Sequence, residues 1–133
     1  MRCLLDTQAL IWTLMDIERL SQAAREMIAD PSVLKNVSVV SFYEMAIKIS
    51  IGKLKLKGLV LKDLPALLYS RGAEIIVLEP FETISLERLP LKEGHHDPFD
   101  RMLICQAINR NLTLLSSDKK IAQYRENGLS LIW

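Results

Sequence analysis

Three acidic side chains stand just beyond apolar runs that have the composition of buried strands. Asp6 directly follows the first run, Glu44 lies four residues beyond a β-branched run, and Asp118 lies three residues beyond a late run. In open α/β sheets, ligands bind outside the carboxyl ends of the strands. We therefore expect these three carboxylates to share one edge of a sheet. A fourth acid, Asp100, lies in the first turn of a helix, and the order of elements alone does not place it at that edge.

Helix capping is the structural alternative for most of these carboxylates. Ser41-x-x-Glu44 has the form of a capping box. Asp97, which precedes a proline, would cap a helix that carries Asp100 at its third position. Asp118 could likewise cap the last helix. Acids in a first turn stabilise a helix by about 0.3–1 kcal/mol without any ligand.

Gathered at one edge, the four carboxylates would need a cation between them. Two carboxylates ~4 Å apart repel by about 4 kcal/mol at an effective dielectric constant of ~20. Oxygen ligands suit a hard divalent ion, Mg²⁺ or Mn²⁺, rather than zinc. Such an ion lowers the pKa of water and shields the charge that develops on a phosphate. The pattern favours metal-assisted hydrolysis of a phosphodiester.

Strands and helices alternate through the whole chain, which predicts one α/β domain over residues 1–133. The pattern indicates parallel strands joined by right-handed crossovers, with helices on both faces of the sheet. Expected strands cover residues 2–5, 37–40, 75–78, 112–115 and 129–132. Expected helices cover residues 9–15, 21–29, 41–52, 62–70, 83–89, 97–109 and 119–127. The alternating lysines and leucines of 53–57 could form a short extended edge.

Composition limits the partners and the compartment. The net charge is +1, so contact with nucleic acid would have to come from a local basic patch. Cys3 and Cys105 lie in apolar runs and are interpreted as buried, reduced thiols. The first residues do not form a signal peptide, and no apolar run is long enough to span a membrane. We expect a cytoplasmic protein.

Four segments, in order, resemble the motif blocks of PIN-domain nucleases. The blocks are Leu4-Leu5-Asp6-Thr7, Val40-Ser41-Phe42-Tyr43-Glu44-Met45-Ala46-Ile47-Lys48, His95-His96-Asp97-Pro98-Phe99-Asp100-Arg101-Met102-Leu103 and Leu115-Ser116-Ser117-Asp118. The His-x-Asp-Pro-Phe-Asp-Arg run, with Ser-Ile-Gly-Lys at 50–53, is similar to the VapC-type toxins of bacterial toxin–antitoxin pairs. The sequence departs from the family at Gln8, where a histidine is frequent.

The resemblance implies a parallel sheet of about five strands flanked by helices. It implies an endoribonuclease that depends on Mg²⁺ or Mn²⁺, a homodimer, and an antitoxin partner that inhibits the site. Carried over by position, Asp6, Glu44, Asp100 and Asp118 form the acidic quartet, so the resemblance brings Asp100 to the shared edge. Ser116 matches the hydroxyl position that supports Asp6.

The four acids are expected to differ in role. Asp6 and Asp100 are predicted to bind the metal directly. Glu44 is predicted to be either a ligand or the partner of a water on the metal. Asp118 is predicted to act through water or to bind a second metal.

Residues around the quartet have competing interpretations. Asp97 is expected to cap its helix, with support of the site as the alternative. Arg101 could pair with a quartet carboxylate or touch phosphate. His95 lies in a polar loop, where solvent exposure and RNA contact are the two hypotheses. The lysines, of which Lys48, Lys53 and Lys55 are the candidates, either form a solvated face or bind the RNA backbone.

Three other classes of protein also place acidic residues on an α/β fold or share the PIN fold. A catalytically silent PIN-fold module that only binds an antitoxin or another partner is the main alternative, and the intact quartet argues against it. A haloacid-type phosphatase needs Asp-x-Asp after its first strand, and Asp6-Thr7-Gln8 does not fit. A phosphoryl-accepting receiver needs paired acids early in the chain. No glycine-rich phosphate loop is present.

Overall fold

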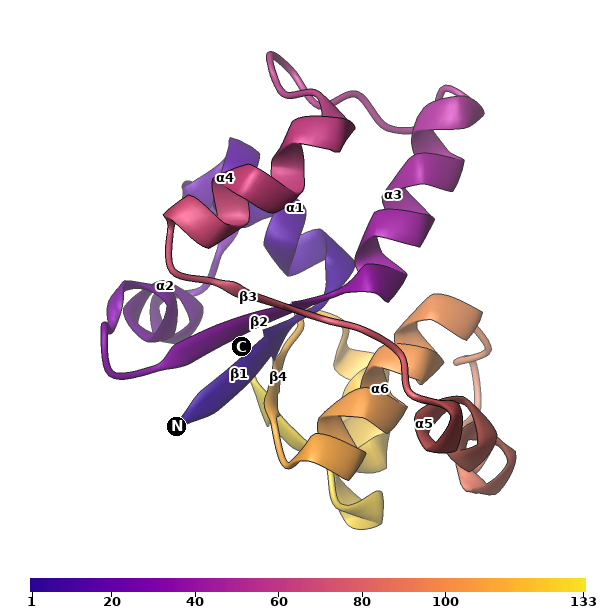
Figure 1. The fold of residues 1–133 in the computed structure, drawn as a ribbon. Helices are drawn as coiled ribbons and strands as arrows, with labels where there is room; N and C mark the ends of the chain where they lie inside the picture. Colours follow the sequence, from indigo (N-terminus) through magenta and orange to yellow (C-terminus); the bar gives the residue numbers. More distant parts are fainter.

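A computed structural model describes residues 1–133, and Figure 1 shows their arrangement. The strands are β1 (Arg2–Leu5), β2 (Leu34–Ser38), β3 (Glu74–Ile76), β4 (Thr113–Leu115) and β5 (Ser130–Ile132). The α-helices are α1 (Thr7–Met15), α2 (Gln22–Ala29), α3 (Val39–Ser50), α4 (Leu64–Ser70), α5 (Pro80–Ser85) and α6 (Pro98–Arg110). The 3-10 helices are η1 (Ile17–Arg19), η2 (Leu61–Asp63), η3 (Leu86–Arg88) and η4 (Lys119–Asn127).

The five strands form one parallel sheet in the order β3-β2-β1-β4-β5. The central strand β1 pairs with β2 on one side and with β4 on the other, and Leu5 aligns with both Val37 and Leu115. Because all strands point the same way, their carboxyl ends lie along one edge of the sheet. The predicted fold class, a parallel five-stranded α/β sheet flanked by helices, is confirmed.

Helices cover both faces of this sheet (Figure 1). Two hydrophobic clusters lie on opposite sides of β1. Leu4 points into a cluster with α6 and η4, whereas Cys3 and Leu5 point into a cluster with α1, α2, α3 and α4. This follows from the two-residue period of a strand. Both cysteines are buried and free, as expected for reduced thiols.

The junction between β2 and α3 differs from the expected one. The strand was predicted to reach Val40 and the helix to begin at residue 41, but the helix begins at Val39. The hydroxyl of Ser38 accepts a hydrogen bond from the Val40 N–H at 3.1 Å and caps the helix. A serine cap thus prevails over the β-propensity of two valines. The alternative interpretation of Ser41 and Glu44 as a capping box is therefore wrong.

Two further segments settle questions that the sequence left open. The lysine-rich residues 53–57 form a loop after α3 and join no strand. Helix α6 ends at Asn111, which has a left-handed backbone with φ of 53°, and β4 begins two residues later. So short a connection requires the helix to run antiparallel to β4. The start of α6, with Asp100, therefore lies at the carboxyl edge of the sheet.

No helix has both the length and the apolar composition needed to cross a bilayer.

Candidate metal centre

Four carboxylates from four separate segments line one cleft of about 260 Å³. They are Asp6 after β1, Glu44 in α3, Asp100 in the first turn of α6, and Asp118 after β4. The rest of the lining comprises Thr7, Gln8, Ile11, Lys48, Asp97 and Ser117. Lys48 is the single cationic side chain in this set, so the cleft is strongly acidic.

Asp6 is held at the end of the central strand and is 5% exposed. Its Oδ1 accepts a hydrogen bond from the Ala9 N–H at 2.7 Å, so it caps α1 as well as lining the cleft. Burial raises the pKa of Asp6 to about 6, against hydrogen bonds from the Ser116 hydroxyl and the Ala9 N–H. The charges of Glu44 and Asp118 raise this pKa further. Two acids far apart in the sequence therefore act on Asp6 electrostatically.

Glu44 is 5% exposed and lies in the second turn of α3. One turn later on the same helix, Lys48 Nζ lies 2.6 Å from Glu44 Oε2. The other oxygen, Oε1, is buried and has no hydrogen-bond partner. Thr7 donates a hydrogen bond to Ser41 at 3.0 Å, which ties α1 to α3 close to Glu44. Glu44 therefore presents a buried oxygen without a partner in an acidic cleft.

Asp100 carries the strongest sign of mutual repulsion. Burial raises the pKa of its carboxyl to about 7, and the charges of Asp97, Asp6, Glu44 and Asp118 add to this effect. Asp97 itself caps α6, because its Oδ1 accepts hydrogen bonds from the N–H groups of Phe99 and Asp100, both at 2.9 Å. The capping expected of Asp97 is confirmed.

Asp118 is the most exposed of the four, with 37% of its side chain accessible. Its Oδ1 caps η4 by accepting the Lys120 N–H at 2.9 Å. Its own N–H donates to the Ser116 hydroxyl at 3.2 Å. Ser116 therefore contacts both Asp6 and Asp118, and it links the ends of β1 and β4.

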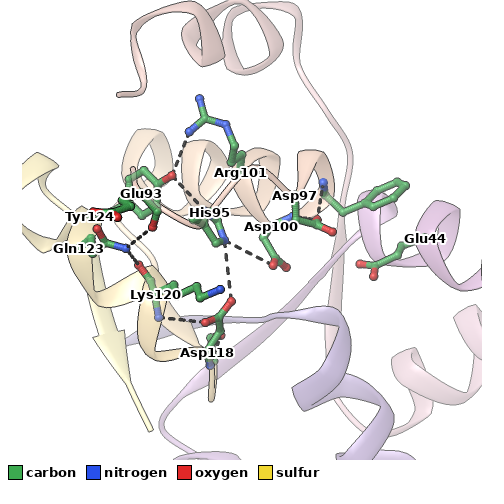
Figure 2. A network of polar contacts seen from close by, with 12 residues as sticks. Glu44, Glu93, His95, Asp97, Asp100, Arg101, Asp118, Lys120, Gln123 and Tyr124 are labelled. Atoms are coloured by element: carbon green, nitrogen blue, oxygen red, sulfur yellow. Dashed lines mark hydrogen bonds and ion pairs between the residues drawn. The ribbon is translucent and has the colours of Figure 1, made fainter. Parts of the chain in front are cut away.

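His95 is placed quite differently from the exposed loop position that its polar neighbours suggested. It is 3% exposed, and Figure 2 shows it beside the carboxylates of Asp100 and Asp118. Its Nε2 lies 3.5 Å from Asp100 Oδ2 and 3.9 Å from Asp118 Oδ2. Its Nδ1 is 3.0 Å from the hydroxyl of Tyr124. In the sequence, only the closeness of His95 to the beginning of α6, which carries Asp100, indicated that it lies beside the site.

The donor set fits a hard divalent cation. Glu44 Oε1 is a buried oxygen without a partner, and the pKa values of Asp6 and Asp100 are raised first by burial and then by the neighbouring carboxylate charges, which a cation would offset. Carboxylate oxygens predominate, as Mg²⁺ and Mn²⁺ require. Asp6, Glu44 and Asp100 are the residues best placed to hold such an ion, with Asp118 at the open side.

The model of the PIN domain family matches residues 3–127, almost the whole chain. This chain belongs to the PIN-domain family. Among solved structures it is similar to VapBC2 from Rickettsia felis bound to a DNA fragment from its promoter, with 20% identity, a TM-score of 0.72, and coverage of 99% of this chain and 98% of that one. It is also similar to VapBC-1 from nontypeable Haemophilus influenzae, with 17% identity, a TM-score of 0.65, and coverage of 99% and 97%. No curated protein matches it.

Arg101 of this PIN domain forms no ion pair with a quartet carboxylate. Its guanidinium donates to the carbonyls of Leu89 and Pro90 and to the Tyr124 hydroxyl, at 3.0, 2.9 and 2.9 Å. One residue further along a helix turns the side chain about 100° away from Asp100. Arg101 is therefore buried against the loop before α6, where it pairs with no quartet carboxylate and does not face the cleft.

The candidate RNA-binding lysines do not form one surface. Lys48 lines the acidic cleft of the PIN domain and contacts Glu44. Lys53 and Lys55 are exposed in the loop after α3, and Lys55 lines a separate, largely apolar groove with residues such as Ile49. Of the three, only Lys48 is positioned beside the quartet.

Proposed function

We propose that this PIN domain is an endoribonuclease that hydrolyses RNA with Mg²⁺ or Mn²⁺ held by the acidic quartet. The observation that carries the proposal is the convergence of Asp6, Glu44, Asp100 and Asp118 on one cleft. The charges of Asp6, Glu44 and Asp118 also contribute to the raised pKa of Asp100. A divalent cation between these carboxylates would offset their repulsion while all of them stay ionised.

The side chains of the cleft have different roles in the proposed reaction. Asp6 and Asp100 would hold the ion, and Glu44 would offer its free Oε1 from α3. Asp118, at the more exposed side, faces incoming water and substrate. When bound, a divalent ion supplies Lewis acidity that makes water a better nucleophile and shields charge on the phosphate. Lys48 supplies the one cationic side chain in the lining of the cleft and would attract the phosphate of the substrate.

Biologically, we propose that the protein is the toxin of a toxin–antitoxin pair, acts in the cytoplasm as a homodimer, and is inhibited by a cognate antitoxin. Support comes from the two similar folds, both of which are VapBC proteins. Induced expression with a growth readout tests toxicity, and co-expression of a small protein encoded beside the gene tests inhibition. Growth unaffected by the wild-type protein would contradict the toxin role and leave nuclease activity to be judged separately.

The nuclease proposal is tested by cleavage of a purified RNA in Mg²⁺, in Mn²⁺ and in excess chelator. We expect cleavage only with a divalent ion, and a loss of at least about a hundredfold in Asp6→Asn and Asp100→Asn. Asp63→Asn, at an exposed acid outside the cleft, is the matched control and should cleave normally. Metal-independent cleavage, or full activity in both quartet variants, would instead identify a contaminant or another site. A folded protein without cleavage would favour the silent interaction module.

A further inference from the structure

Three residues that the quartet does not include form a chain of polar contacts that ends at the cleft. Arg101 Nη1 donates to the Tyr124 hydroxyl at 2.9 Å, and the same hydroxyl lies 3.0 Å from His95 Nδ1. The opposite ring nitrogen, His95 Nε2, is buried and forms no hydrogen bond. It faces Asp100 Oδ2 and Asp118 Oδ2 (Figure 2).

The protons on Arg101, Tyr124 and His95 determine which group donates and which accepts in each of these hydrogen bonds. A guanidinium only donates, so Arg101 occupies one lone pair of the Tyr124 oxygen. Tyr124 is fully buried, and the nearest acceptor for its own proton is His95 Nδ1. A buried hydroxyl proton without an acceptor costs about 1–3 kcal/mol, so Tyr124 donates to Nδ1. His95 must then carry its proton on Nε2.

The loop before α6 holds the ring in this position. Gly94 has a positive φ of 70°, and the His95 N–H donates to the Lys92 carbonyl at 3.1 Å, which closes a tight turn. The His95 ring also meets the Tyr124 ring edge-on, with centroids 5.4 Å apart. Arg101 anchors the same loop through the carbonyls of Leu89 and Pro90. The ring is therefore fixed by packing as well as by Tyr124.

We propose that Arg101, Tyr124 and His95 form a donor relay whose last group, the Nε2–H of His95, positions the carboxylates of Asp100 and Asp118. This inference rests on the proposed metal site and adds a positioning residue to it. His95 Nε2 lies 3.5 and 3.9 Å from two carboxylate oxygens, and the partial positive charge of its N–H offsets the repulsion between them. The other oxygen of Asp100 stays available to a cation, and Asp118 Oδ1 keeps a second lone pair beside the one that accepts the Lys120 N–H. Metal sites whose ligands are oriented by outer hydrogen bonds are built in this way.

The rival arrangement is a nitrogen ligand. His95, Asp100 and Asp118 offer ligand atoms that all lie within 4.8 Å of one another, so a lone pair on Nε2 could in principle bind the ion. That arrangement needs the proton on Nδ1, which would leave the Tyr124 hydroxyl proton without an acceptor. The two arrangements therefore differ in one observable, the tautomer of His95.

The tautomer is measured by long-range ¹H–¹⁵N correlation on protein labelled with [¹⁵N]histidine, at pH 8, without metal and with saturating Mg²⁺. The chain has only two histidines, so His96→Gln assigns the spectrum. We expect a protonated Nε2 and an unprotonated Nδ1 for His95 in both samples. A protonated Nδ1, or an Nε2 that loses its proton on addition of metal, would overturn the relay in favour of the nitrogen ligand.

Mn²⁺ affinity, measured by electron paramagnetic resonance of the free ion, tests the positioning role. His95→Leu removes the donor and is expected to weaken binding about tenfold or more. His95→Gln keeps an N–H donor and should recover part of the loss, while His96→Gln, at the exposed neighbour, should match the wild type. Equal losses in the Leu and Gln variants, with both folded, would contradict positioning by a donor.

Tyr124→Phe tests the relay as a connected unit. It should weaken Mn²⁺ binding in the wild type but add nothing in the His95→Leu background, because its effect passes through His95. Equal effects in the two backgrounds would contradict the relay. If the wild-type protein binds no Mn²⁺, the proposed metal site fails, whereas the tautomer in the metal-free sample still tests the relay by itself.

Discussion

Lys48 Nζ lies 2.6 Å from Glu44 Oε2, and the pair spans one turn of α3 at the wall of the acidic cleft. Almost half of the Lys48 side chain is exposed, whereas Glu44 is buried. The lysine therefore contacts the Glu44 carboxylate and remains accessible to solvent. An incoming phosphate would find its nearest cation at Lys48.

Replacement of Lys48 by glutamine is expected to weaken RNA binding through loss of a phosphate contact. The slope of log K against log salt for single-stranded RNA should fall by about 0.7, the contribution of one phosphate contact. Binding is measured by fluorescence anisotropy in the Asp6→Asn background, which prevents cleavage. Lys53→Gln and Lys55→Gln are the matched comparisons, because both lysines are exposed outside the cleft. An unchanged slope for Lys48→Gln would remove Lys48 from the RNA-binding surface.

Ser116 is expected to couple Asp6 to Asp118. Its hydroxyl contacts the Asp6 carboxylate and accepts the Asp118 N–H, so Ser116→Ala loosens two acids at once. Mn²⁺ affinity should fall about tenfold, and the free energy of unfolding by about 1–2 kcal/mol. A metal titration measures the Mn²⁺ affinity, and a urea titration measures the free energy of unfolding. Ser117→Ala, whose hydroxyl has no hydrogen bond, should change neither quantity, and an equal effect of the two substitutions would contradict the coupling.

A buried ion pair between α5 and α6 should dominate stability away from the cleft. Arg110 contacts both carboxylate oxygens of Glu82, which is fully buried. Burial opposes the charged form, but hydrogen bonds from Arg110, the Glu79 N–H and Gln106 outweigh it and hold the pKa of Glu82 below its ordinary value. Arg110→Met should lower the free energy of unfolding by about 2–4 kcal/mol, because it leaves a buried charge unpaired.

The pH dependence of this pair has a definite sign. Glu82 has a lower pKa in the folded than in the unfolded protein, so its contribution is fully present above the unfolded value of about 4.3. It is lost as the pH falls through the lower, folded value. The difference in unfolding free energy between wild type and Glu82→Gln should therefore be constant from pH 7 to about pH 5 and shrink below about pH 4. A difference independent of pH would contradict the ionised pair.

Local sequence patterns predicted the first strand and the cap of α6. The strand that ends at Asp6 was visible as an apolar run, and the Asp97 cap was visible as an aspartate before a proline. The start of α3 was misplaced by two residues, because Ser38 and Ser41 are both plausible caps and only the tertiary structure selects Ser38. The resulting helix has Glu44 in its second turn, facing the cleft rather than capping its own backbone.

His95 and Arg101 show what local patterns could not supply. Their common partner, Tyr124, is 29 and 23 residues away in the sequence, in η4, which follows β4 in the chain. Nothing in the polar surroundings of His95 signals burial, because the apolar cover comes from that distant tyrosine. Contacts of this range depend on how the helices pack on the sheet, and no periodicity within one element encodes them.

The most direct test of the metal-dependent site is to titrate Mn²⁺ into the wild-type protein and into Asp100→Asn while following RNA cleavage in the same samples. Asp100 is chosen because the pKa of its carboxyl is raised to about 7 by burial and by the charges of Asp97, Asp6, Glu44 and Asp118. We predict that wild-type cleavage rises in step with Mn²⁺ binding, and that Asp100→Asn loses both together while keeping its folded circular dichroism spectrum. Cleavage by the wild type without bound Mn²⁺, or normal Mn²⁺ binding and cleavage by Asp100→Asn, would contradict the account.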